Sequence, residues 1–143
     1  MSAINTPSYV SAGEIRASAI LTGSYVVAKT FGLNDTTGSR QDEQRRNVES
    51  THLLLDFTFT KGSLTYCFIK VEYSDDGATW FQQTSEATSA GVSTLSSQEY
   101  KLTGTGTGTV AVPLIKHIWM RVSAIGVGTV TSSSLAMQAR FIS

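Results

Sequence analysis

The stretch LLLDFTFTKGSLTYCFIKVEY, residues 53–73, decides the fold class. Apolar and polar residues alternate on both sides of Lys61 and Gly62, which is typical of two half-buried strands joined by a tight turn. The inward set of the first strand is Leu53, Leu55, Phe57 and Phe59. In the second strand Lys70 and Glu72 should face water. The inward set there is Thr65, Cys67, Ile69, Val71 and Tyr73.

The same alternation recurs near the C-terminus. Residues 118–124 place Ile118, Met120, Val122 and Ala124 on one face, and residues 135–142 do the same with Leu135, Met137, Ala139 and Phe141. Weaker strand candidates cover 19–30, 79–83, 98–102 and 109–114. About eight strands without a convincing helix predict an all-β fold. We expect a single antiparallel β-sandwich, jelly-roll-like, although strand count alone does not fix the topology.

Three segments interrupt this pattern. Residues 1–17 have scattered apolar groups without a clean period, and we expect an extended N-terminal arm before a sandwich domain over 18–143. Residues 32–50 carry many charges and are expected to form a long loop, with a short helix at 40–48 as a candidate. The repeat TGTGTGT, residues 103–109, is expected to be a flexible hairpin connection.

Composition narrows the classes of function. Eleven basic and eleven acidic residues balance each other, and only 15% of residues are charged, so no nucleic-acid or membrane-surface partner is predicted. Ser and Thr, 19 of each, favour strand surfaces and turns. The N-terminus lacks the pattern of a signal peptide, and no apolar run reaches the length of a membrane span. A soluble product of a reducing compartment is expected.

No catalytic or metal-binding pattern emerges from the residues. Cys67 is the single cysteine and is expected to be a small buried hydrophobe. His52 and His117 lie sixty-five positions apart and do not show zinc spacing. Asp75 and Asp76 offer too few oxygens for calcium and too little burial for acid–base work. We therefore predict a protein that is not an enzyme and has no metal or cofactor.

The segment Ser74, Asp75, Asp76 and Gly77 is predicted to be a hairpin turn. Asp-Gly is a turn signal because glycine tolerates positive φ, and the oxygen of Ser74 or Asp75 can accept a backbone N–H. Tyr73 and Trp80 would then be packing residues on either side of the turn.

Aromatic residues on outward faces suggest a partner surface, because interfaces are enriched in Trp, Tyr and Arg. If Lys70 faces solvent, Tyr66 and Phe68 lie on the same face. The candidate partner interface is Ile4, Tyr9, Val10, Tyr66, Phe68, His117, Trp119 and Arg121. The alternative is that a second sheet, the arm or the long loop covers these rings in an ordinary sandwich core.

Two segments, FTKGSLTYCFIKVEYSDDGATWFQQ (59–83) and IKHIWMRVSAIGVGTVTSSSLAMQARF (115–141), resemble a pattern in small structural proteins of tailed-bacteriophage virions. The resemblance implies a capsid-associated β-sandwich, most directly a head decoration or cement protein. Such a protein is made in the host cytoplasm, binds the major capsid protein or another virion protein on the capsid surface, and forms homo-oligomers, with a trimer favoured. Neck, tail or fibre-associated virion proteins would need the same features.

A different class shares part of this pattern. The spacing S-D-D-G-x-x-W also occurs in discoidin-like modules, which leaves a carbohydrate-binding or adhesion module as the alternative. The spacing differs from the Asp box of sialidases, in which Gly and Trp come one residue later, and so a propeller is not expected.

Overall fold

The computed structural model describes residues 9–32, 50–82, 84–97, 99–114 and 118–142, with segments 9–11, 84–89 and 93–97 described by their backbone alone. The described chain is all-β, and no helix in it is long and apolar enough to cross a membrane. The strands are β1 (Tyr9–Ala19), β2 (Val26–Gly32), β3 (His52–Thr60), β4 (Leu64–Ser74), β5 (Thr84–Ser89), β6 (Val92–Ser97), β7 (Glu99–Leu102), β8 (Gly106–Pro113), β9 (Trp119–Gly128) and β10 (Ser134–Ile142).

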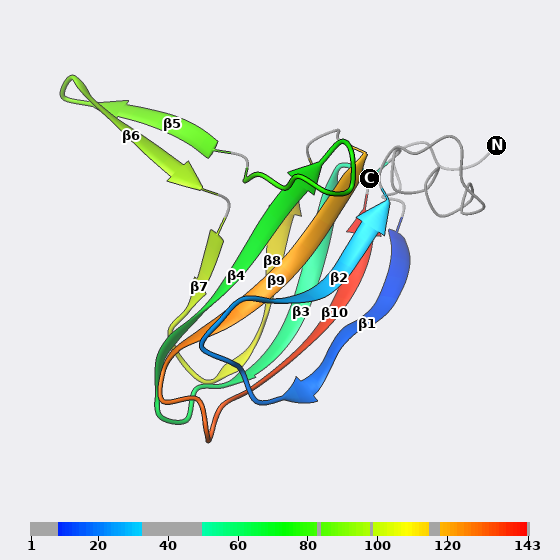
Figure 1. Ribbon diagram of the computed structural model, residues 1–143, viewed down its shortest axis with the longest axis vertical. Helices are drawn as coiled ribbons and strands as arrows, with labels where there is room; N and C mark the ends of the chain where they lie inside the picture. The colour runs from blue at the N-terminus through cyan, green and yellow to red at the C-terminus, as the bar shows by residue number, and fades with distance from the viewer. Residues whose placement is uncertain (1–8, 33–49, 83, 98, 115–117, 143) are drawn as a thin grey trace.

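Eight of these strands form two antiparallel four-stranded sheets, in the orders β1-β10-β3-β8 and β2-β9-β4-β7. The sheets pack as the two layers of one β-sandwich (Figure 1). Almost every connection crosses from one sheet to the other, so residues that are close in sequence lie in different layers. The predicted all-β sandwich is confirmed. Strands β5 and β6 form a separate hairpin that extends away from the sandwich in Figure 1.

The core lies between the inward faces of the two sheets. Phe31 of β2 and Phe141 of β10 meet edge to face across the sandwich, with ring centroids 5.4 Å apart. The phenol of Tyr73 donates to the Pro113 carbonyl at 3.3 Å and links β4 to β8. The predicted inward residues of β9 and β10 are buried: Met120, Val122, Ala124, Leu135, Met137, Ala139 and Phe141. Each large apolar side chain that leaves water contributes roughly 1.5–3 kcal/mol.

The two strands that decided the fold class form as predicted. Leu64 N donates to the Lys61 carbonyl at 3.0 Å, and Gly62 takes the positive φ, 56°, that closes the turn. Thr65 corrects the predicted inward set, because its side chain is exposed. The pairing of β4 with β9 shifts between Leu64 and Tyr66, so Thr65 is the extra residue of a β-bulge.

Residues 9–17 also differ from the prediction, which placed them in an arm. They belong to β1, which pairs with β10 from Tyr9 opposite Ile142 to Ala19 opposite Leu135. Three register shifts interrupt this pairing. Each shift reverses which residues face inward, and this explains why no clean period is visible in the sequence. Residues 1–8 lie outside the described part of the chain.

The TGTGTGT repeat, predicted to be a flexible hairpin connection, is a further correction. Its last four residues, from Gly106, begin β8 and pair in regular register with β3. Gly108 has a packing role, since a Cβ there would lie 2.9 Å from the Phe57 ring. The candidate strand over 79–83 is wrong as well, because within its described residues, 79–82, only Phe81 forms a bridge, with Tyr73. Most of the predicted loop over 32–50, including the candidate helix, lies outside the described residues.

Candidate functional site

Several aromatic and basic side chains lie together on the outer face of the sheet β2-β9-β4-β7. Directly opposed residues in an antiparallel pair share a face. The register sets Phe68 opposite Lys101, and Lys70 opposite Glu99. On the other side of β4, Glu72 lies opposite Arg121. Alternate residues of β4, β7 and β9 therefore form one continuous outward grid.

Three cations on this grid stack on aromatic rings. The Lys70 ammonium lies 3.9 Å from the Tyr25 centroid, Lys101 lies 4.2 Å from that of Tyr66, and the Arg121 guanidinium lies 4.4 Å from that of Trp80. The rings of Tyr66 and Phe68 also meet edge to face at 5.0 Å. We call this set the aromatic–cationic face: Tyr25, Tyr66, Phe68, Lys70, Trp80, Lys101 and Arg121.

Glu72 is the acidic centre of this face, and its position corrects the expectation that it faces open water. Only 8% of the residue is exposed. Its Oε1 accepts a hydrogen bond from Arg121 Nε at 3.1 Å and lies 3.7 Å from Lys70 Nζ. A carboxylate with so little access to water needs such partners. The ion pairs thus hold Lys70 and Arg121 at fixed positions on the sheet.

Tyr25 joins the face from the connection that precedes β2. Its hydroxyl donates to Glu99 Oε1 at 3.2 Å, and Gln82 Nε2 donates to the same oxygen at 3.4 Å. Burial, followed by the adjacent Glu99 charge and hydrogen bond, raises the pKa of Tyr25 to about 12. The phenol therefore remains a neutral donor over the ordinary pH range.

The S-D-D-G segment forms a turn held by side-chain oxygens. Ser74 Oγ accepts a hydrogen bond from Gly77 N at 2.9 Å. This confirms the prediction that an oxygen of Ser74 or Asp75 accepts a backbone N–H. Asp76 is the second acceptor: its Oδ1 accepts from the backbone N–H groups of Thr79 at 2.7 Å and Ala78 at 2.8 Å. These bonds lower the pKa of Asp76 to about 2. The turn is therefore built around an ionised carboxylate.

This turn also contacts the outer side of the same sheet, at Trp119. A Cβ on Gly77 would meet the Trp119 indole nitrogen at 3.5 Å, so the turn packs on that ring. Tyr73 and Phe81 exchange two backbone hydrogen bonds, which return the chain to β4. Phe81 is thus the residue that pairs with Tyr73, and the ring of Trp80 packs on Arg121.

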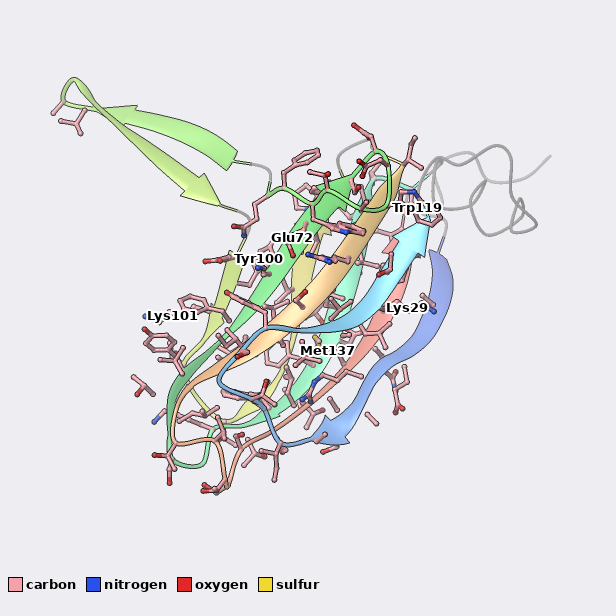
Figure 2. All side chains as sticks on the ribbon, viewed as in Figure 1. Lys29, Glu72, Tyr100, Lys101, Trp119 and Met137 are labelled. Carbon is pink, nitrogen blue, oxygen red and sulfur yellow. The ribbon has the colours of Figure 1, made fainter. Side chains whose placement is uncertain are left out.

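The structure separates the residues of the predicted partner interface. Tyr66, Phe68, Trp119 and Arg121 share the outer face of one sheet, where Figure 2 labels Trp119 at one end and Lys101 on β7. Tyr9 and Val10 lie in β1, in the other sheet. Ile4 and His117 fall outside the described residues. A surface that combines all eight residues is therefore not observed.

Several members of the aromatic–cationic face were not predicted from the sequence. Lys101 could have been found by the same alternation, because residues 98–102 were already a strand candidate and Lys101 opposes Phe68. Tyr25 and Trp80 lie outside the strands, and nothing in their local sequence indicates the cation that each contacts.

Outside this face the structure confirms that Cys67 is buried, and burial raises its pKa to about 11. Among the described residues no group of three or more His, Cys, Asp or Glu side chains is placed to hold a metal ion. Comparison of the chain with protein-family models, curated proteins and solved structures finds no match.

Proposed function

We propose that this protein is a structural component of a phage virion that binds the assembled capsid surface and stabilises it. The observation that carries the proposal is the aromatic–cationic face, on which three cation–π pairs and a buried carboxylate lie on the outer side of one sheet. Protein–protein interfaces are enriched in Tyr, Trp and Arg. The resemblance of residues 59–83 and 115–141 to phage virion proteins supplies the identity of the partner, a major capsid protein.

The arrangement of this face suits docking against a preformed surface. Arg121 is fixed between Trp80 and Glu72, and Lys70 between Tyr25 and Glu72, so little side-chain freedom is lost when a partner binds. A ligand that binds only the assembled state stabilises that state by mass action, by about 2.7 kcal/mol per site at a concentration one hundred times Kd. Stabilisation of a capsid in this way requires no chemical step.

The strand order is compatible with this role. In the orders β1-β10-β3-β8 and β2-β9-β4-β7, strands from the N-terminal and C-terminal parts of the chain alternate within each sheet. We interpret this order as a jelly roll, an architecture of two Greek keys that occurs in viral capsid domains and in lectins. The architecture is compatible with both the virion proposal and the carbohydrate-binding alternative. The two functions therefore have to be distinguished by what the aromatic–cationic face binds.

The test is addition of purified protein to phage heads that were assembled without it. We expect saturable binding at a fixed number of copies per head, and a higher temperature of head disruption. Lys101→Glu reverses an exposed charge on the aromatic–cationic face and should weaken binding by about tenfold or more. Thr58→Glu, on the outer face of the opposite sheet, is the matched control and should bind as the wild type does.

Two results would contradict the proposal. If Thr58→Glu abolishes binding and Lys101→Glu does not, the docking face is on the other sheet. If heads do not bind the protein but a purified neck, tail or fibre component does, the protein belongs to that part of the virion, and the capsid role is wrong.

A carbohydrate-binding or adhesion function is the second candidate, because Tyr66 and Phe68 offer adjacent rings on a sheet surface. Sugars stack on open ring faces, whereas Lys101 already occupies one face of Tyr66. This contact favours a protein partner. A glycan array on the wild type and on Tyr66→Ala tests the alternative: glycan binding that depends on Tyr66 would replace the capsid proposal.

A further inference from the structure

The hairpin of β5 and β6 lacks the support that a two-stranded sheet normally needs. It forms a sheet of its own and projects from the sandwich (Figure 1). Its register is regular from Thr84 opposite Ser97 to Ser89 opposite Val92, and the tip residues Ala90 and Gly91 both have positive φ. An isolated hairpin in water is marginally stable at best. A third strand along one of its edges would stabilise it.

The edges of this hairpin are also unprotected. Proteins usually guard exposed strand edges with lysine, proline, bulges or very short strands. The strand sequences TSEATS and VSTLSS contain one charged residue, Glu86, and no proline. Strand β6 has no charge at all, and its pairing with β5 has no bulge. Among the strands that the structure describes, β6 pairs with β5 alone, so its outer edge is open to pairing with another strand.

The sandwich has four edge strands, and three of them are protected. Strand β1 has three register shifts, and β2 has one shift beside Lys29. Strand β7 is four residues long and carries Glu99 and Lys101. Strand β8 differs from all three: its eight residues, GTGTVAVP, are uncharged, its one proline is the last residue, Pro113, and its register with β3 is regular throughout. Thr107 and Ala111 of β8 are exposed.

We propose that β6 of one copy pairs along the open edge of β8 of a second copy, and so extends the sheet β1-β10-β3-β8 by the two strands of the hairpin. The backbone N–H and C=O groups of both open edges would then be satisfied by each other. Both strands are neutral, so the contact carries no charge repulsion. The partner is a second copy because this chain supplies both the donor strand β6 and an acceptor strand, β8, that has neither a charge nor a bulge.

The contact is head-to-tail: each copy gives its hairpin to one neighbour and receives the hairpin of another. Contacts of this kind close into rings when the rotation between copies allows it. The proposed pairing uses strand edges and leaves the aromatic–cationic face free, so it does not depend on the capsid role. A failure of either proposal can be recognised without reference to the other.

Sedimentation velocity of the full chain provides the first test, and we expect a closed oligomer. Replacement of residues 84–97 by a short Gly-Ser linker removes the donor and should give a monomer. The double variant Thr107→Lys/Ala111→Lys places two charges on the acceptor strand and should also give a monomer. The control Thr58→Lys/Gln138→Lys adds the same charge at exposed positions of the interior strands β3 and β10, and should keep the wild-type oligomer.

A mixing experiment is the most specific test of the head-to-tail pairing. The linker variant retains an intact β8 edge, and the β8 variant retains an intact hairpin. Mixed in equal amounts, they should form a one-to-one dimer that goes no further, although each alone is monomeric. The proposal is overturned if the wild type is monomeric, if either variant keeps the wild-type oligomer, or if the mixture does not associate. Should the β8 variant fail to fold, the linker variant alone still decides whether the hairpin makes the contact.

Discussion

Arg121 and Glu72 lie opposite each other on β9 and β4, and the Arg121 Nε donates to the Glu72 carboxylate at 3.1 Å. The arginine also stacks on Trp80, which comes from the segment after the S-D-D-G turn. One side chain therefore connects two strands and a loop. Glu72 is only 8% exposed, so its carboxylate depends on the ion pairs with Arg121 and Lys70. Both of these cations belong to the aromatic–cationic face.

Arg121→Met should destabilise the fold, because it removes the main partner of a nearly buried carboxylate. Loss of one member of a buried pair typically costs 3–5 kcal/mol, and since Lys70 remains near Glu72 we expect about 2–4 kcal/mol. Urea denaturation followed by tryptophan fluorescence measures the change. Lys101→Met is the control: it removes an exposed cation from the Tyr66 ring and should cost less than about 1 kcal/mol. Equal losses in the two variants would show that the Glu72 pair does not support the fold.

Gly62→Ala should destabilise the turn between β3 and β4. Gly62 has a φ of 56°, and a Cβ at this position would overlap the carbonyl and hydroxyl oxygens of Ser132. Strain and steric overlap together should cost about 2 kcal/mol or more. Gly104→Ala, where a Cβ meets nothing within 4 Å, should change stability by less than about 0.5 kcal/mol. Similar thermal shifts for the two variants would contradict this account of the turn.

The parts of the fold that could be predicted are those in which a strand keeps strict alternation. Residues 53–60 and 135–141 show their inward faces directly, since the side-chain period of a strand is two. A bulge breaks this relation by one residue. For this reason the alternation alone places Thr65 in the core and predicts an arm over residues that belong to β1, which has three register shifts. The candidate strand over 109–114 corresponds to the later part of β8, but the start of β8 at Gly106 is not predictable, because its glycines resemble a linker until the Phe57 ring beside Gly108 is known.

The candidate site also contains residues that could be predicted from the sequence and residues that could not. Tyr66, Phe68 and Arg121 follow from alternation, because each lies on a regular strand. The residues that contact this surface from outside its strands do not follow from alternation. Tyr25 and Trp80 reach Lys70 and Arg121 only after the loops fold back over the sheet, and the burial of Glu72 depends on contacts between β4 and β9, almost fifty residues apart in the chain. Such relations depend on tertiary structure and leave no local pattern.

Cys67 should be unreactive in the folded protein and should make stability fall at alkaline pH. Burial raises its pKa from 9.0 to about 11, so the fold holds the neutral thiol. The contribution of this neutral thiol to the free energy of unfolding is complete below pH 9. It is lost as the pH rises from 9 toward 11, because in that range only the unfolded chain releases the proton. Thiol labelling with a colorimetric disulfide should be slow without denaturant and complete in urea. Rapid labelling of the native protein would contradict the burial of Cys67. Cys67→Ser, which removes this titration, should reduce the alkaline loss of stability.

Asp76 should control the order of the S-D-D-G turn through its charge. Its pKa of about 2, set by the N–H groups of Thr79 and Ala78 and by Ser74, means that the turn is stabilised above the ordinary pKa of 3.8 and loses this support as the pH falls toward 2. The amide resonance of Thr79 should therefore titrate with a midpoint near 2. Asp76→Asn should remove this transition and speed hydrogen exchange at residues 78 and 79 severalfold. Asp75→Asn is the matched control, because Asp75 accepts instead from Ile118 N, and it should leave the Thr79 transition in place. A midpoint near 3.8, or a transition that survives in Asp76→Asn, would show that another group organises the turn.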